Sequence, residues 1–292
     1  MMISFTNKVF HQQFFVTNYK NSNVIICGVD VNDEFVETIE QKRKPSVFFL
    51  TEPINNFPNS CYTNSLKLFN SNKFDLTMGC IEHNPKSNLY KFPLYLFENN
   101  FNMNDTEQFN NVNKMVGNIT YSELNEKKFC VLINSWDKNT RTVIYKKVKT
   151  IGDITCPGKL FNNCSNVTLN QVGKKKYINQ FLFNICSENF DTNNINGYIT
   201  EKLMDCCLSG AIPIYTGWFD DYDEKIFNKD RILFYNSEDE SSQIQLVNKL
   251  EQLLSDKQTL LEFYNQPVFC NTAYDTIHML KIELDTAIKR LS

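Results

Sequence analysis

Long apolar runs are absent from this sequence of 292 residues. No stretch of about 18 consecutive apolar residues occurs, so the sequence predicts no membrane-spanning helix. The first residues, MMISFTNKVFHQQFF, lack the continuous apolar core of a signal peptide. We therefore expect a soluble, cytoplasmic protein.

The sequence also lacks a long basic run, and its formal net charge is only −3. A nucleic-acid backbone or an anionic membrane surface is therefore not an expected partner. Histidine is scarce, and none of His11, His83 and His278 lies beside a serine or cysteine in a nucleophilic motif. This scarcity argues against a hydrolase with a catalytic triad.

Cysteine is plentiful, with ten residues, but no CxxC pair occurs and a zinc site has little support. Several cysteines lie inside apolar runs such as VIICGV and FCVLIN. This placement is typical of buried, reduced thiols. The even count leaves open a bridge such as Cys156 with Cys164.

Short apolar runs alternate with polar or helical stretches along the chain. These runs occupy residues 23–29, 46–50, 74–80, 89–97, 128–134, 180–188, 211–215 and 231–235. Runs of this kind suit parallel strands buried on both faces, and the alternation with helices predicts an α/β fold. The Asn-rich stretch 97–118 indicates a linker or loop. We therefore expect two α/β domains, 1–120 and 121–292, with helices at the C-terminal end.

The sequence GYITEKLMDCCLSGAIPIYTG, residues 197–217, predicts a helix with unusual chemistry at its start. Thr200 is the expected N-cap, Glu201 and Lys202 fall in the first turn, and Gly210 ends the helix. A lysine is disfavoured there because both it and the helix end are positive, unless an anion binds beside it. The first turn therefore predicts a diphosphate site, with Glu201 suited to ribose hydroxyls. The alternative is a surface helix with a Glu-Lys pair.

FLFNICSENF followed by GYITEKLMDCCLSGAIPIYTG strongly resembles the donor-binding signature of the α-1,3/4-fucosyltransferases, glycosyltransferase family ten. In that family a strand ending in Phe-x-x-x-x-Glu-Asn leads through a loop to Tyr-[IV]-Thr-Glu-Lys, an apolar helix and [IV]-Pro-[IV]-x-x-Gly. VLINSWDKNTRTVIYKKV resembles the family segment that carries an arginine shortly before a tyrosine, here Arg141 and Tyr145. SVFFLTEPINNFP resembles the segment with the catalytic base, which would be Glu52. The chain looks most like soluble bacterial or viral members.

The resemblance implies a GT-B fold, in which two Rossmann-like domains face each other across a cleft. It also implies inverting transfer of fucose from GDP-fucose to a hydroxyl of a glycan acceptor. Glu52 would take the proton from the acceptor hydroxyl. The donor-binding residues implied are Arg141, Asn189, Tyr198, Thr200, Glu201 and Lys202.

No divalent metal is expected, because Arg141 and Lys202 can neutralise the leaving diphosphate. The triplet Asp221-Tyr222-Asp223 resembles a metal-binding DxD motif, but we expect a solvated turn there.

Two alternatives remain open. The loop 189–197 looks longer than is usual in the family, which leaves room for another nucleotide sugar, such as a UDP-linked N-acetylhexosamine or an activated deoxysugar. A non-catalytic glycan- or nucleotide-binding relative is the other alternative. The retained charged residues argue against it, because such residues cost stability.

Overall fold

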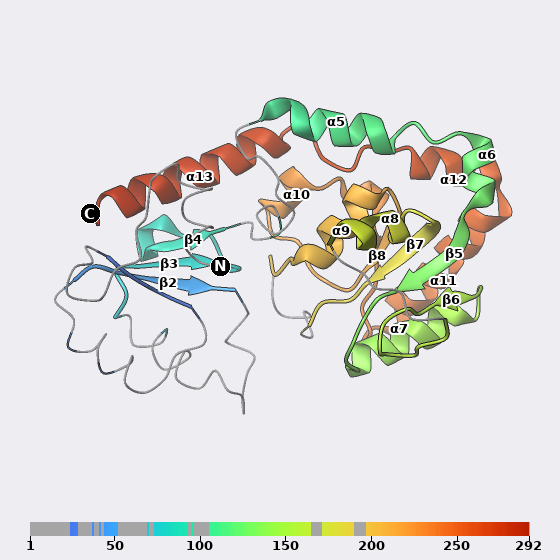
Figure 1. Ribbon diagram of the computed structural model, residues 1–292, viewed down its shortest axis with the longest axis horizontal. Helices are drawn as coiled ribbons and strands as arrows, with labels where there is room; N and C mark the ends of the chain where they lie inside the picture. Colours follow the sequence, from blue (N-terminus) through green and yellow to red (C-terminus); the bar gives the residue numbers. More distant parts are fainter. Residues whose placement is uncertain are drawn as a thin grey trace. The chain divides into compact units, whose positions relative to one another are not determined.

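The computed structural model shows a chain with two compact units, each built on a parallel β-sheet (Figure 1). The residues it describes are 24–28, 37, 41, 44–51, 69, 73–92, 95, 105–164, 171–189 and 197–291. Unit 1 comprises 1–104, 196–198 and 274–292, and unit 2 comprises 105–195 and 199–273.

The sheet of unit 1 has the order β1-β2-β3-β4, and neighbouring strands are parallel. Its strands are β1 (Ile25–Cys27), β2 (Ser46–Leu50), β3 (Leu76–Gly79) and β4 (Leu89–Lys91). Every residue of β2 and β3 is buried, which explains why their sequences are apolar on consecutive positions. Gly79 ends β3 at φ +140°, where a Cβ would lie 1.9 Å from the carbonyl oxygen of Leu50, so no other residue fits there.

The sheet of unit 2 has five parallel strands in the order β6-β5-β7-β8-β9. They are β5 (Lys128–Leu132), β6 (Ile154–Thr155), β7 (Phe181–Cys186), β8 (Ile212–Tyr215) and β9 (Leu233–Phe234). The chain first moves from β5 to β6 and then returns to β7 on the other side of β5. Because parallel crossovers are right-handed, this reversal places the connecting helices on both faces of the sheet.

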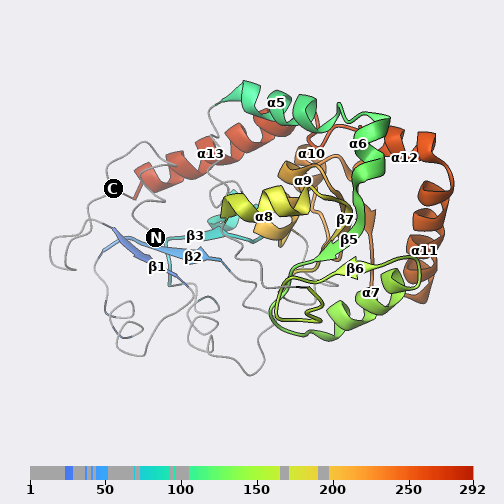
Figure 2. The ribbon, with the colours of Figure 1, turned by 45° about the vertical axis from the view of Figure 1, so that its right-hand side comes forward.

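The helices of unit 2 form two layers around this sheet (Figure 2). The helix α8 (Gln171–Ile178) packs against α9 (Glu201–Ser209), and both contact β7. On the other face, α7 (Asn139–Lys149) and α11 (Glu240–Ser255) contact each other. The helix α7 also contacts the edge strand β6, and α11 contacts the edge strand β9. The remaining helices are α5 (Thr106–Val116), α6 (Tyr121–Glu126), α10 (Asp223–Ile226), the 3-10 turn η4 (Lys229–Arg231) and α12 (Lys257–Tyr264).

The Asn-rich stretch 97–118 does not form the predicted linker throughout, because α5 occupies residues 106–116. Asp105 caps this helix, and Phe109, Val112 and Val116 are buried along one face of it. Their spacing of three, four and seven residues is helical, although asparagines separate them. The start of the stretch, 97–104, lies outside the described residues.

The division into units differs from the predicted boundary near residue 120. The helix α5 belongs to unit 2, because Phe109 packs edge-on against Phe269 and the side chain of Asn113 bonds to the backbone of Val268 and Phe269. At the other end, α13 (Ala273–Lys289) belongs to unit 1 from residue 274 onward, and its Glu283 pairs with His83 at 2.6 Å.

All nine cysteines among the described residues are free thiols, including Cys156 and Cys164. The bridge between these two, which the sequence left open, is therefore not formed. Seven of the nine are buried, and Cys164 and Cys270 are partly exposed. Across the described residues, no helix is long and apolar enough to cross a membrane.

Candidate active site

The reversal of strand order in unit 2 marks the expected binding edge of its sheet. The chain leaves β5 toward β6 and later enters β7 on the opposite side of β5, so the loops after β5 and β7 diverge. Open parallel sheets bind their ligands at such a point, outside the carboxyl ends of the strands. Arg141 follows β5, while Glu188 and Asn189 follow β7. The sequence-predicted donor residues of unit 2 therefore gather at this edge.

The first turn of α9 lies at this same edge and is tied to the end of β7 by one carboxylate. Thr200 is the N-cap of α9, as predicted, and its hydroxyl accepts a bond from the backbone N–H of Lys202. The same hydroxyl donates to Oε2 of Glu188 at 2.6 Å, and the backbone N–H of Thr200 donates to Oε1 at 3.0 Å. Oε1 also accepts from the Tyr215 hydroxyl at 3.2 Å. Glu188 thus joins the carboxyl ends of β7 and β8 to the start of α9.

Lys202 lies between two carboxylates. Its ammonium is 3.2 Å from Oε1 of Glu201 and 3.7 Å from Oε2 of Glu188, and it also bonds to the Thr200 hydroxyl. Its side chain is 14% exposed, whereas that of Glu188 is completely buried. The two carboxylates explain how a lysine is accommodated at the positive end of a helix.

The ionisation of the three groups follows from this arrangement. Burial by itself would lower the pKa of Lys202, but Glu188 and Glu201 outweigh it and the pKa lies above its ordinary value. Burial raises the pKa of Glu188, and Lys202 and Thr200 offset only part of that rise. Burial would also raise the pKa of Glu201, but the charges of Lys202 and Lys174 bring it below its ordinary value. The site therefore presents a charged ammonium beside an ionised, partly exposed Glu201.

Arg141 fastens the two loops at the binding edge. Its Nη1 donates to the carbonyl of Trp136 at 2.7 Å, and its Nη2 donates to the carbonyl of Glu188 at 2.8 Å and to Oδ1 of Asn189 at 3.2 Å. The residue is only 2% exposed. Two of the predicted donor-binding residues, Arg141 and Asn189, are thus in direct contact. The guanidinium holds loop backbone as well as contributing positive charge beneath the site.

Of the two remaining predicted site residues, the structure describes Tyr198 but not Glu52. Tyr198 is fully buried and directly precedes Ile199 and the N-cap of α9. Glu52 lies outside the described residues, as does most of the loop 189–197, namely residues 190–196. The role of Glu52 as a base therefore stays a prediction.

Glu188 is the residue that sequence reasoning missed as a site residue, although the motif quoted for the resemblance contains it. A signal was present, because this glutamate stands two positions after Cys186, the last residue of the buried strand β7, where an ionisable side chain needs a polar partner.

The expected solvated turn of the triplet 221–223 forms only in part, since residues 221 and 222 are in a turn and Asp223 begins α10. Asp221 is exposed, but Asp223 is fully buried at the start of α10, and its Oδ2 accepts from the backbone N–H of Asp220. Ile226, the apolar residue of this short helix, is also fully buried, so Asp223 and Ile226 lie on the buried side of α10. In the part of the chain that the structure describes, no cluster of three or more His, Cys, Asp or Glu residues could hold a metal ion.

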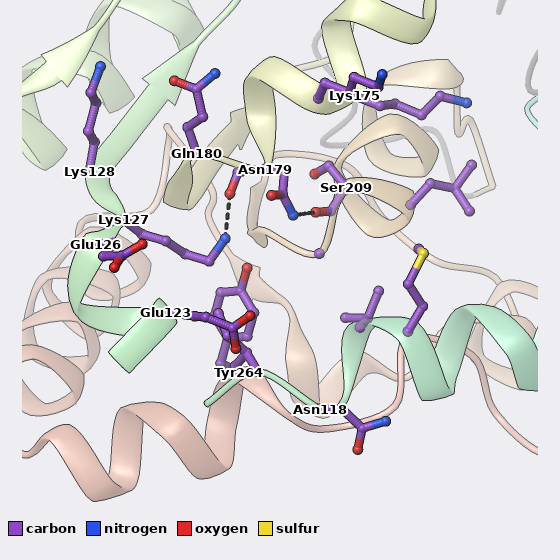
Figure 3. A pocket seen from close by; sticks show the side chains of 16 residues that line it. Asn118, Glu123, Glu126, Lys127, Lys128, Lys175, Asn179, Gln180, Ser209 and Tyr264 are labelled. Carbon is purple, nitrogen blue, oxygen red and sulfur yellow. Dashed lines mark hydrogen bonds between the residues drawn. The ribbon is translucent and has the colours of Figure 1, made fainter. Parts of the chain in front are cut away.

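A cavity of 660 Å³ lies at the opposite edge of this sheet, where α5, α6, α8 and α9 end (Figure 3). Lys128 begins β5 and Gln180 directly precedes β7, so the cavity lies at the amino ends of the strands. Lys127 donates to the carbonyl of Asn179, whose side chain donates to the carbonyl of Ser209 at 2.7 Å. The C-terminal ends of these helices carry a partial negative charge, which repels an anion and which the lysines there offset. The cavity is therefore poorly suited to a diphosphate.

Comparison with known proteins shows the family of the chain. The family model described as "Glycosyltransferase family 10 (fucosyltransferase) C-term" matches residues 122–276, more than half of the chain. An α-(1,3)-fucosyltransferase of Helicobacter pylori is 34% identical over 77 residues, which span 26% of this chain and 15% of that relative's length.

Solved structures of α1,3-fucosyltransferase share the fold. One has a TM-score of 0.65 at 18% identity, covering 99% of this chain and 86% of that chain. Another, solved with GDP-fucose, has a TM-score of 0.56 at 17% identity, covering 99% of this chain and 98% of that chain. These likenesses confirm the predicted GT-B class of α/β fold, and the family match shows that the chain belongs to glycosyltransferase family 10, the fucosyltransferases.

Proposed function

We propose that this protein transfers fucose from GDP-fucose to a hydroxyl of a glycan acceptor, with inversion at the anomeric carbon. The observation that carries the proposal is the ammonium of Lys202, held by two carboxylates at the N-terminus of α9 and at the carboxyl edge of a parallel sheet. Family membership supports the chemistry, and GDP-fucose is bound by a protein of the same fold.

On the donor side, the leaving group is a nucleoside diphosphate whose negative charge grows as the bond to fucose breaks. Lys202 and the positive end of α9 would stabilise that charge, and Arg141, in the first turn of α7, would add a second positive charge. Glu201, ionised and 35% exposed, would accept hydrogen bonds from sugar hydroxyls of the donor. Asn189 and Tyr198 would complete the donor pocket.

On the acceptor side, we propose Glu52 as the base that takes the proton from the attacking hydroxyl. In the sequence it stands two positions after Leu50, the last residue of β2. Residues that follow a parallel strand occur where such sheets place their functional groups. Inversion then follows from a single displacement, in which the acceptor oxygen attacks the anomeric carbon as the diphosphate leaves.

We further propose that the transfer needs no divalent metal. Two fixed cations, Lys202 and Arg141, supply the charge that a metal supplies to a diphosphate in other transferases. The buried position of Asp223, with one carboxylate oxygen already bonded to backbone, speaks against a DxD metal site.

The test compares binding of GDP, UDP and dTDP by calorimetry in EDTA, followed by transfer from GDP-fucose to a panel of glycans. We expect GDP to bind most tightly and to raise the melting temperature. NMR of the product should show the anomeric configuration opposite to that of the donor. Tighter binding of UDP or dTDP would reassign the donor, and retained configuration would contradict direct displacement by the acceptor.

A further inference from the structure

Two helices of unit 2 begin with the same arrangement of a threonine and a glutamate. In α6, Thr120 is the N-cap, and its backbone N–H and hydroxyl both donate to Glu123, at 2.8 and 2.7 Å. Glu123 stands three positions after Thr120, which makes this a capping box within one helix. In α9, the backbone N–H and hydroxyl of Thr200 donate to Glu188 in the same way.

The difference between the two caps is the origin of the carboxylate. The third helical residue of α9 is Leu203, which is fully buried and cannot serve as the acceptor. Glu188 fills this place from the end of β7, 12 residues before Thr200 in the sequence. A carboxylate that comes from another element fixes the start of α9 to the sheet, which a local capping box does not do.

The borrowed carboxylate also lies beside the cation of the site. Its Oε2 is 3.7 Å from the Lys202 ammonium, and its backbone carbonyl accepts from Arg141 at 2.8 Å. Glu188 therefore contacts both cations assigned to the diphosphate, Lys202 through its side chain and Arg141 through its backbone. Glu123, in contrast, is exposed and lines the cavity at the opposite edge of the sheet.

We propose that Glu188 is a positioning residue of the donor site, which anchors the N-cap of α9 to β7 and holds the Lys202 ammonium in place for an anionic donor. The inference deepens the proposed function and rests on it for the identity of the donor. Glu188 needs no contact with the donor itself, because it is buried behind Lys202 and Thr200.

The charges around the pair favour this role. Lys202 faces Glu188, Glu201 and, with the opposite effect, the positive Arg141. Both carboxylates raise the pKa of Lys202: Glu188 acts by its charge from a position shielded from water, and Glu201 acts by its charge and by a hydrogen bond at 3.2 Å. Glu188 in turn faces the hydroxyl of Tyr215, and burial raises the pKa of this tyrosine, with a further rise from Glu188.

The test replaces Glu188 by glutamine, which keeps its size and most of its hydrogen bonds but removes its charge. The matched control is Glu123→Gln, which makes the same change at the other threonine cap. In the ligand-free proteins, competitive acetylation read by mass spectrometry gives the pH midpoint of the Lys202 amine. GDP affinity is measured by calorimetry across the same pH range. Ionisation of the guanine base of GDP affects all variants equally, so it cancels when their affinities are compared.

We expect the Lys202 midpoint to fall by about 1–3 pH units in Glu188→Gln and to stay unchanged in Glu123→Gln. The pH at which GDP affinity is lost should fall with it. An unchanged midpoint in Glu188→Gln, or an equal shift in the control, overturns the inference.

The inference can still be tested if Glu188→Gln does not fold or if the wild type does not bind GDP. If Glu188→Gln does not fold, the wild-type midpoint decides, because a Lys202 midpoint below the ordinary lysine value would show that Glu188 does not hold the ammonium. If the wild type binds no GDP, the proposed function fails, while the acetylation midpoints still test the positioning role of Glu188.

Discussion

Replacing Arg141 by lysine separates two roles of this residue that the sequence alone does not distinguish. The resemblance to the family predicts a contact with the donor diphosphate. The structure shows a guanidinium only 2% exposed, whose two terminal nitrogens donate to backbone carbonyls of different loops, at Trp136 and Glu188. Lysine keeps the charge but has no planar fork, so it can serve one of these loops and not both.

The size of the effect follows from the bonds that lysine cannot make. A hydrogen bond from a charged group contributes about 1.5–3 kcal/mol, and a buried carbonyl left without a donor costs about 1–3 kcal/mol. Because the ammonium recovers part of this loss, we expect the free energy of unfolding of unit 2 to fall by about 2–4 kcal/mol. In a unit of this size, that fall corresponds to a decrease in melting temperature of about 4–16 °C.

The assay measures stability and binding on the same preparation. Urea unfolding followed by circular dichroism gives the free energy of unfolding, and calorimetry gives the dissociation constant of GDP. We expect the dissociation constant to rise about 10- to 100-fold, because small displacements of site groups carry effects of this size. Arg290→Lys is the matched control, since Arg290 is exposed near the end of α13.

Stability separates the two roles. If Arg141→Lys unfolds at the wild-type urea concentration but binds GDP weakly, Arg141 contacts the donor and does not hold the loops. If both properties are unchanged, neither role is correct. A loss in both, with Arg290→Lys unaffected, agrees with a residue that fastens the loops of the site.

Three further predictions concern the base, the metal and the buried carboxylate. Glu52→Gln should lower the transfer rate about 100- to 10,000-fold while GDP affinity stays constant, because the base acts on the acceptor; a parallel loss of GDP affinity would contradict this assignment. Transfer should survive EDTA, and loss of activity that manganese restores would show that a metal is needed. Lys202→Met should destabilise the protein more at pH 8 than at pH 5. Burial raises the pKa of Glu188 above its ordinary value of 4.5, and loss of Lys202 raises it further. A raised pKa in the folded state favours folding at low pH only, so the variant loses stability relative to the wild type as the pH increases. Urea midpoints at the two pH values measure this, and an equal destabilisation at both would count against the ion pair.

The strands of both sheets could be predicted because parallel strands buried on both faces have consecutive apolar residues. The run SVFFL became β2, and each residue of that strand is buried. The strand β6 escaped prediction because Ile154–Thr155 is too short to show any pattern. The helix α5 escaped because asparagines separate the apolar residues of its buried face, and composition alone then resembles a loop.

The site was predictable to the extent that its chemistry is local in sequence. Thr200, Glu201 and Lys202 follow one another at a helix start, and Gly210 ends that helix at φ +85°. The role of Glu188 is not local, because its partners lie 12 and 27 residues away and meet it only after β7, α9 and β8 have assembled. The same is true of Arg141, whose burial under two loops depends on the packing of both.

The most direct test of the account is the affinity of GDP for the wild type and for Lys202→Met, measured by calorimetry at pH 7 in EDTA. Methionine retains the length of the side chain without its charge. We expect GDP to bind the wild type without metal and the variant to lose about 2–4 kcal/mol of binding free energy, the range for one fixed donor facing an anion. Equal affinity of the two folded proteins for GDP would show that the diphosphate does not bind at the start of α9.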